Sequence, residues 1–286
     1  MSDLLGRLLC DMDQAGSAVL VMSPHLDDAV WSCGALIAHL APRHRITVVT
    51  AFTAASPRPW SLPARRHLRA VGVTDAEALF TQRRSEDRQV LDGLGVEVVH
   101  LGFRDALFRR AGDAPGGRAD PGGQAGPGGQ AGPGGRPRRP GWPAYPTFRF
   151  DAARGRIASC DARLPAEVSA RAGEVARAGA ARLVFAPLGV GRHVDHLITR
   201  EAARELGTPG RIVYYSDFPY SLKAEPEAGF VRRAGLVPYP WHVGRAENAN
   251  RMAGYRTQFA GLFRDGTVPT RPEIYWLPAN DSTTEV

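Results

Sequence analysis

The sequence predicts an α/β fold of Rossmann-like type, a single domain whose mainly parallel sheet carries helices on both faces. Short apolar runs alternate with longer helix-like segments along the chain, which is the pattern of repeated strand–helix–strand units. Two of the runs, 19–22 and 183–186, are wholly apolar and are closed by Pro24 and Pro187, as buried parallel strands are. With 286 residues and 43% hydrophobic content, the chain is long enough to form one large core.

Composition excludes several classes of protein. No stretch approaches 18 apolar residues, so we expect no membrane span, and the start of the chain does not have the basic, apolar-cored pattern of a signal peptide. Three widely spaced cysteines predict no disulfide framework, and we expect a reducing, cytoplasmic setting. A formal net charge of +7 is found in many nucleic-acid-binding proteins. Here, however, the basic residues are thinly spread arginines apart from Lys223, so we expect no nucleic-acid partner. The same positive charge would also favour the binding of an acidic or phosphorylated substrate.

The first apolar run leads directly into Ser-Pro-His25-Leu-Asp27-Asp28, and a helix is predicted from there to Leu40. These polar residues therefore fall at the carboxyl end of a strand, the edge at which open α/β sheets bind ligands. Imidazole and carboxylate suit zinc or iron. One aspartate can bind the metal while the other handles protons; alternatively, Asp28 caps the helix and Asp27 complements its dipole.

A second cluster favours the metal site. The run ending at Pro187 is followed by a glycine-rich loop and by His193-Val-Asp195-His196, which opens another helix. Parallel strands bring such loops together on one edge of a sheet, so His25 is expected beside the later histidines. Two histidines and one aspartate around an open position form a catalytic metal site rather than a closed structural one.

The remaining elements follow from periodicity and turn signals. In chain order they are a lead-in helix at 4–13, a strand at 45–52, a helix at 74–94, a strand at 96–101, a helix at 164–180, a helix at 197–206, a strand at 211–217, a helix at 248–263 and a short strand at 273–277. The segment 112–143 repeats Pro-Gly-Gly-Gln-Ala-Gly and is expected to be a flexible insertion within the domain. No Gly-x-Gly-x-x-Gly follows the first strand, which removes support for a dinucleotide site.

Each of four further residues has two alternative roles, one in the site and one outside it. Trp60, on the loop at 53–63, can stack on a sugar or pack under its own loop. Arg83 can contact substrate or pair with Glu86 one helical turn away. Asp105 can face the site or be a solvated loop carboxylate, and His242, in a proline-rich turn, can be a site residue or a surface residue.

The two clusters resemble a known family. Ser-Pro-His-Leu-Asp-Asp followed by Gly-Arg-His-Val-Asp-His is similar to the paired motifs of the PIG-L/LmbE-like zinc-dependent N-deacetylases, usually written Ala-His-Pro-Asp-Asp-Glu and His-Pro-Asp-His. The run Arg83-Arg-Ser-Glu-Asp also fits that family. The resemblance covers roughly 19–105 and 183–277.

The resemblance implies a role for each motif residue. The expected zinc ligands are His25, Asp28 and His196; the expected catalytic residues are Asp27, His193 and Asp195; and the expected substrate-binding residues are Arg83 and Asp105. In that scheme Asp27 takes a proton from the attacking water. His193 stabilises the oxyanion or protonates the leaving amine, and Asp195 orients it.

Three positions depart from the family pattern. The family glutamate is Ala29 here, the proline of the second motif is Val194, and Gly191 stands where the mycothiol branch has a tyrosine. These details look closer to glycopeptide-antibiotic N-acetylglucosaminyl deacetylases. We therefore expect a Zn²⁺-dependent hydrolase of linear amide bonds that removes an N-acetyl or N-acyl group from an amino sugar, in natural-product biosynthesis. The alternatives are an amidase acting on thiol-sugar conjugates and a non-catalytic sugar- or nucleic-acid-binding protein.

Overall fold

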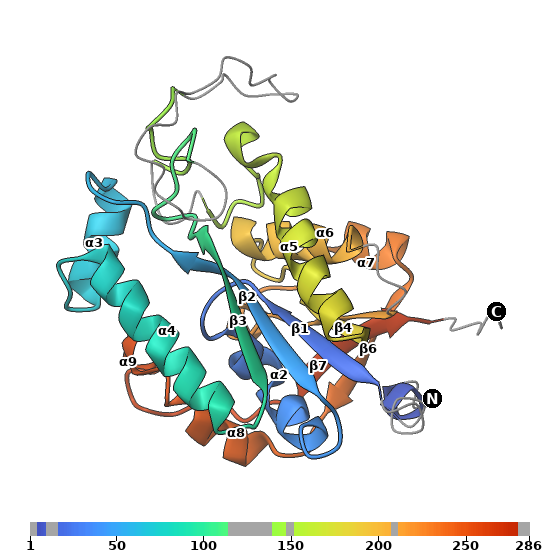
Figure 1. Ribbon diagram of the computed structural model, residues 1–286. Coiled ribbons are helices and arrows are strands. Elements are labelled where there is room, and N and C mark those ends of the chain that lie inside the picture. Colours follow the sequence, from blue (N-terminus) through green and yellow to red (C-terminus); the bar gives the residue numbers. More distant parts are fainter. Residues whose placement is uncertain (1–4, 10–16, 114–138, 147–151, 207–210, 280–286) are drawn as a thin grey trace.

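The computed structural model describes residues 5–9, 17–113, 139–146, 152–206 and 211–279. They form one seven-stranded sheet with the strand order β3-β2-β1-β4-β5-β7-β6 (Figure 1). The strands are β1 (Ala18–Ser23), β2 (Ile46–Ala54), β3 (Glu97–Arg104), β4 (Ala181–Pro187), β5 (Arg211–Tyr215), β6 (Leu236–Trp241) and β7 (Glu273–Pro278). The first five pair in parallel, whereas β7 pairs antiparallel with both β5 and β6. The predicted α/β fold with a mainly parallel sheet is confirmed.

Helices cover both faces of this sheet (Figure 1). They are α2 (Asp28–Leu40), α3 (Leu62–Ala70), α4 (Ala76–Asp92), α5 (Leu164–Ala178), α6 (Val194–Arg204), α7 (Ala228–Arg233), α8 (Arg245–Met252) and α9 (Arg256–Leu262), with short 3₁₀ turns at Ser159–Asp161 and Tyr220–Leu222. In β1, Val19 and Val21 pack with the α2 side of the core, whereas Leu20 and Met22 pack with the α5 and α6 side. Successive strand residues point to opposite faces, so a strand buried on both sides is apolar throughout, as the sequence predicted.

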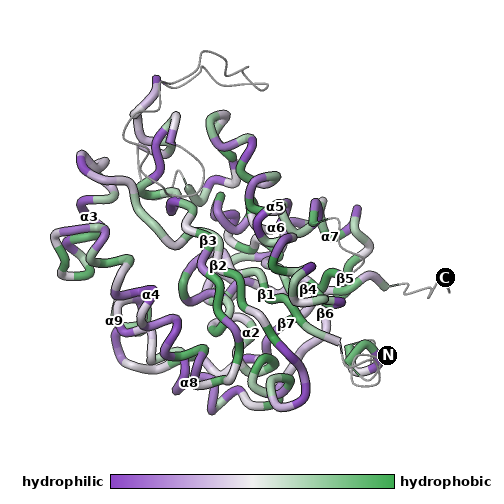
Figure 2. Tube along the Cα trace, viewed as in Figure 1, coloured by the Kyte–Doolittle hydropathy of each residue, from purple (hydrophilic) through white to green (hydrophobic). Residues whose placement is uncertain are grey.

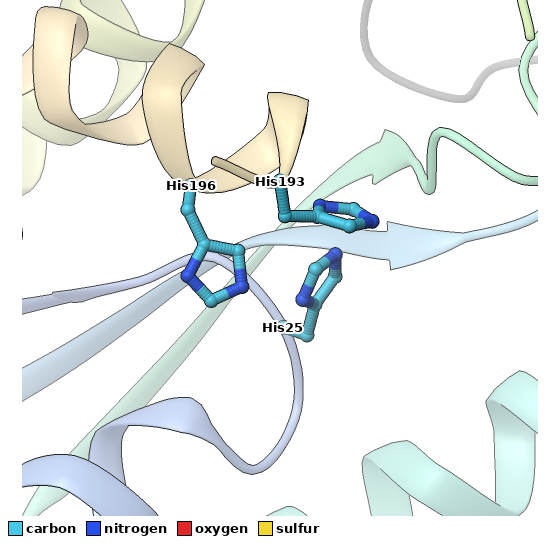
Figure 3. Close-up of side chains that lie close together, drawn as sticks. All are labelled: His25, His193 and His196. Atoms are coloured by element: carbon cyan, nitrogen blue, oxygen red, sulfur yellow. The ribbon is translucent and has the colours of Figure 1, made fainter. Parts of the chain in front are cut away.

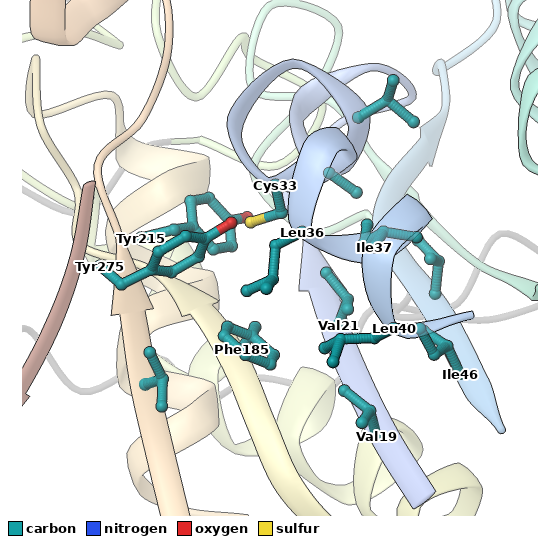
Figure 4. Packing of buried hydrophobic residues seen from close by; sticks show 14 of the residues in the cluster. Val19, Val21, Cys33, Leu36, Ile37, Leu40, Ile46, Phe185, Tyr215 and Tyr275 are labelled. Carbon is teal, nitrogen blue, oxygen red and sulfur yellow. The ribbon is translucent and has the colours of Figure 1, made fainter. Parts of the chain in front are cut away.

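Packing of α2 against the sheet fixes the start of that helix. Its Leu36, Ile37 and Leu40 pack against β1, β2 and Phe185 of β4, and its Cys33 lies next to Tyr215 and Tyr275 of β5 and β7 (Figure 4). Figure 2 shows that the strands are mainly hydrophobic and that the outer helices bear most of the hydrophilic residues. Since this face of α2 is buried, the loop between β1 and α2 is held at a fixed position over the sheet edge.

The strand order places the two motif loops side by side. Chain connections leave β1 toward β2 on one side, while β4 and β5 lie on its other side. Such a reversal of direction opens a crevice outside the carboxyl ends of the strands, where α/β proteins bind ligands. The loops after β1 and β4 both start at this point, which brings together segments about 170 residues apart in sequence.

The structure differs from the sequence-based expectations in the last third of the chain. The single helix expected at 248–263 is two helices, α8 and α9, separated by residues that include Gly254. The turn expected before His242 is instead the edge strand β6, in which Pro238 and Pro240 alternate opposite Trp276 and Ile274. Proline lacks the amide hydrogen that an inner strand needs, so it is tolerated only at such an edge. Helices α3 and α7 were not predicted, and most of the expected insertion, residues 114–138, lies outside the described residues.

Candidate active site

Ser23, the last residue of β1, organises the loop that follows it. Its hydroxyl donates to the carbonyl of His25 at 2.7 Å and accepts the amide of Ala29 at 3.0 Å. The N-cap residue of α2, Asp27, makes no side-chain capping bond, and Asp28 accepts the amide of His25 at 2.9 Å instead. The serine thus binds an otherwise unpaired helix amide, and both aspartate side chains are available for other roles.

Two imidazoles from different loops meet at one oxygen of Asp28. Its Oδ2 lies 3.0 Å from Nδ1 of His25 and 3.3 Å from Nε2 of His196, and all three side chains are buried. His193 completes a group of three histidine rings that point toward one another between the β1 loop and the start of α6 (Figure 3). The structure therefore brings together His25, Asp28 and His196, which the sequence predicted as ligands.

The far side of each imidazole is held by a carboxylate. His25 Nε2 lies 3.2 Å from Oδ2 of Asp195, and His196 Nδ1 lies 2.6 Å from Oδ1 of Asp217. Histidines that bind metals nearly always donate their second ring N–H to such an acceptor, which orients the ring and leaves the other nitrogen unprotonated. Asp217 also accepts the amide of Val190 at 2.7 Å, so it ties the end of β5 to the second motif loop.

The donor set fits a divalent metal ion. His196 Nε2 is buried and has no hydrogen-bond partner within the described part of the chain, although Asp28 is beside it. A buried ring nitrogen that has no hydrogen-bond partner and lies beside a carboxylate is suited to bind a metal ion. Candidate ligand atoms of His25, His193 and His196 lie within 4.8 Å of one another, as do those of His25, Asp105 and Asp195. The second group is less suited, because Asp195 already binds other partners.

Asp195 is placed differently from the sequence-based scheme. Its carboxylate does not bond to the ring of His193; the contact between the two residues runs from the Asp195 amide to His193 Nδ1, at 3.3 Å. The carboxylate is fully buried and accepts from the amide of Ala106 at 2.9 Å and from Arg109 at 2.8 Å, besides its contact with His25. Accepting at Nδ1 favours the tautomer of His193 that has its proton on Nε2.

Asp27 lies beside Arg83, at 3.6 Å between Oδ1 and Nη2. The intrahelical pair of Arg83 with Glu86 is not formed among the described residues; Glu86 instead accepts from the hydroxyl of Thr257 at 2.7 Å. The Nε of Arg83 is buried and has no hydrogen-bond partner in the described ranges. Asp105 also faces the site, with Oδ2 3.7 Å from His25 Nε2.

The charges in this cluster set distinct protonation behaviour for neighbouring groups. Burial and the adjacent charge of Asp28 raise the pKa of Asp27 to about 6. Burial also acts to raise the pKa of Asp28, but the neighbouring His196 and His25 outweigh it and hold that pKa at about 2. Burial and the charge of His25 lower the pKa of His193 to about 4, so its imidazole is neutral at pH 7. The pKa values of the two adjacent aspartates are therefore shifted in opposite directions.

Tyr220 covers one side of the site. Its ring meets His196 edge-on, with the ring centroids 5.3 Å apart. The ring also lies directly over Gly191, where an added Cβ would come within 2.5 Å of Tyr220. Trp60 packs against the cluster under α3 and donates to the carbonyl of Ser56 at 2.9 Å, as its packing interpretation predicts, and His242 is exposed.

Sequence reasoning missed Asp217 and Arg109 as site residues. The sequence pattern places Asp217 at the end of a predicted strand. Its position at the carboxyl edge of the sheet is the signal that could have indicated a role in the site. Arg109 lies on an irregular loop next to the glycine-rich segment, and no pattern in the sequence connects it with Asp195.

The chain is similar to known proteins in sequence and in fold. The sequence model of the family described as PIG-L: GlcNAc-PI de-N-acetylase matches residues 20–206. A 2'-N-acetylparomamine deacetylase of Streptomyces fradiae is 31% identical over 227 residues, which cover 77% of this chain and 64% of that protein. A protein of the same name from Niallia circulans is 24% identical, and the match covers 95% of this chain and 94% of that protein. The solved structure of the zinc-inhibited form of teicoplanin deacetylase Orf2 has the same fold, with a TM-score of 0.65 at 23% identity, covering 93% of this chain and 100% of that one.

Proposed function

Because the chain belongs to the PIG-L family of de-N-acetylases, we propose that it is a zinc-dependent hydrolase that removes the N-acetyl group of an amino-sugar glycoside. The geometry around one atom carries the proposal. Oδ2 of Asp28 faces ring nitrogens of His25 and His196, and the opposite nitrogens of the two rings are held by Asp195 and Asp217. Three protein ligands with oriented imidazoles are the arrangement of a catalytic zinc site, which keeps a further position open.

His25, Asp28 and His196 would hold the zinc ion. Bound there, zinc would polarise the amide carbonyl of the substrate and lower the pKa of a coordinated water toward about 7. The ring of His193 contacts those of His25 and His196, and Asp27 directly precedes Asp28 in the chain. Both are therefore available for the proton transfers of the reaction.

Asp27 is the general base of the proposed reaction. Burial raises its pKa above that of an exposed aspartate, which makes it a better proton acceptor. Arg83, 3.6 Å away, lowers the pKa of Asp27 and so favours the ionised form that the reaction needs.

His193 acts as a neutral hydrogen-bond donor. Its Nδ1 accepts the amide of Asp195, so its proton is on Nε2 and can be directed at the oxygen that becomes negative in the transition state. Burial lowers the pKa of His193 and so favours the neutral ring, and in this proposal the proton for the leaving amine comes from Asp27. Arg83 and Asp105, which border the same residues, contact the sugar oxygens in this proposal.

The substrate class rests on the relatives. Two of them are described as 2'-N-acetylparomamine deacetylases and a structural neighbour as a teicoplanin deacetylase, which are enzymes of antibiotic glycosides. We also propose that the protein works in the cytoplasm and binds no nucleic acid. No helix in the described ranges is long and apolar enough to cross a membrane.

The test is release of acetate and a free amine from three probes: N-acetylglucosamine, an aryl N-acetylglucosaminide and 2'-N-acetylparomamine. Each reaction is run with chelator-treated protein, to which zinc is added back in steps from below to above one equivalent, since one neighbour is a zinc-inhibited form. We expect zinc-dependent deacetylation of at least one of the glycosides. No amine release from any probe at any zinc level would contradict the proposal.

A further inference from the structure

We propose that Arg109 is a positioning residue for this reaction: its guanidinium fixes the carboxylate of Asp195 and, through it, the orientation in which His25 faces the metal site. The catalytic part of this inference rests on the proposed function. The part concerning metal affinity can be measured without any substrate.

The contact between Arg109 and Asp195 is direct and buried. Nη2 of Arg109 lies 2.8 Å from Oδ1 of Asp195, and the two residues are 4% and 0% exposed. The other oxygen of Asp195, Oδ2, faces the amide of Ala106 at 2.9 Å and Nε2 of His25 at 3.2 Å. Arg109 therefore holds one oxygen of the carboxylate while the other is presented to His25.

Arg109 is itself fixed from the side away from the metal site. Its Nε donates to Oδ2 of Asp161 at 2.9 Å and its Nη1 to the carbonyl of Arg104 at 2.7 Å. The hydroxyl of Tyr145 donates to the same oxygen of Asp161 at 2.8 Å. The guanidinium is planar and directs its donors in fixed directions, so three anchored nitrogens leave it no freedom to rotate.

A buried carboxylate needs this compensation. Asp195 has no access to water, and the amide of Ala106 supplies only part of the hydrogen bonding that an ionised carboxylate requires. If the guanidinium is lost, we expect Asp195 to turn or to draw His25 toward itself in search of partners. Either movement would take Nδ1 of His25 away from Asp28, with which it now shares a contact of 3.0 Å. Changes in residues that orient a metal ligand typically cost 10- to 100-fold in metal affinity or activity.

A cavity behind Arg109 allows a more specific test than substitution alone. It has a volume of about 220 Å³ and is lined by Arg104, Arg109 and Asp161 among other residues. A free guanidinium ion is small enough to enter it and reach the space vacated in Arg109→Ala. Urea has the same planar shape without the charge, so it is the matched control for the added ion.

The variants are Arg109→Ala, Arg109→Lys and the control Arg245→Ala. Arg245 forms a buried pair of the same kind with Glu273, at 2.9 Å, but it contacts no residue of the metal site. For each protein we would measure zinc affinity by competition with a chelator, kcat and KM on the glycoside that the wild-type protein deacetylates, and the melting temperature.

We expect Arg109→Ala to bind zinc roughly 10- to 100-fold more weakly and to lose kcat by a similar factor, with KM little changed. Millimolar guanidinium should restore part of both quantities and urea neither, and Arg109→Lys should fall between wild type and Arg109→Ala. Arg245→Ala should lower the melting temperature without changing zinc affinity. Wild-type zinc affinity and kcat in folded Arg109→Ala would overturn the inference, as would equal losses in Arg245→Ala. A wild-type protein that binds zinc but deacetylates no probe would instead contradict the proposed function, and the zinc measurements would still test the role of Arg109.

Discussion

Nε2 of His196 lies 3.3 Å from Oδ2 of Asp28 and forms no hydrogen bond with it, although both side chains are buried. An unpaired buried nitrogen costs free energy, so a site that keeps one has a use for its lone pair. His196 and Asp28 would be among the residues that hold a divalent ion, and binding it would use this lone pair. Substitution of His196 or Asp28 is therefore the most direct test of the metal site.

Asp28→Ala and His196→Ala should each abolish stoichiometric zinc binding and activity, because each removes one of three proposed ligands. The measurement is metal content after dialysis, with the melting temperature as a check on folding. In the wild-type protein, zinc should raise the melting temperature, and it should fail to do so in either variant. Unchanged metal content in both variants would show that the ligand assignment is wrong.

Asp27→Asn should behave in the opposite way from Asp28→Ala. The amide keeps the shape of the side chain but cannot accept the proton, so zinc should remain near one equivalent while turnover falls. General-base catalysis contributes roughly 100- to 10,000-fold, and we expect kcat to drop within that range with KM largely preserved. Loss of zinc from Asp27→Asn would mean that the roles of the two aspartates are reversed.

Asp217→Asn tests a residue that only the structure identified. The asparagine should still accept at one atom, but it removes the charge that holds Nδ1 of His196 at 2.6 Å. We expect zinc affinity to fall roughly 10- to 100-fold, as measured by chelator competition. The control is Asp87→Asn, another buried aspartate, which binds Tyr255 and His100 instead. Equal zinc affinity in both variants would remove Asp217 from the metal site.

The sequence predicted the parts of this molecule whose signals are local. Apolar runs closed by Pro24 and Pro187 identified the two central strands, and the polar residues after them had to meet at one sheet edge because parallel strands share it. The motif residues on those loops were therefore predictable as a cluster.

Contacts between distant loops were not predictable. Whether Asp195 bonds to His193 or to His25 depends on how the segment around Ala106 and Arg109 returns to the sheet, and that segment has no periodic pattern. The edge strand β6 was missed for a different reason. Its prolines read as a turn, and only the antiparallel partner β7 makes an extended proline-rich segment favourable there.

Replacing residues 114–138 with a two-glycine linker should leave folding and zinc binding unchanged. The flanks of this segment already meet: the amide of Ala111 donates to Trp142 at 2.8 Å, and the amide of Gly141 donates to Ala111 at 2.7 Å. The segment is composed largely of glycine, proline and polar residues, which contribute little to a core. A shorter closed loop should, if anything, slightly favour folding. Loss of cooperative melting in the shortened protein would show that the segment is structural.

Gly191→Ala should damage the site through Tyr220. Gly191 has a φ of +81°, which disfavours any side chain, and its new Cβ would lie within 2.5 Å of the Tyr220 ring. The ring would have to move, and its edge-on contact with His196 at 5.3 Å would be lost.

Gly102→Ala separates the two effects. Gly102 has nearly the same φ, +80°, but nothing lies within 4 Å of the position of an added Cβ. This control should cost only the backbone penalty, roughly 1–2 kcal/mol of unfolding free energy, and leave activity per folded molecule unchanged. Gly191→Ala should lose more stability and, in addition, activity. Adding Tyr220→Ala to it should relieve the steric part of the stability loss, because the displaced ring is then absent. If Gly191→Ala and Gly102→Ala lose equal stability and both keep full activity, the tyrosine is not packed against His196 in the working enzyme.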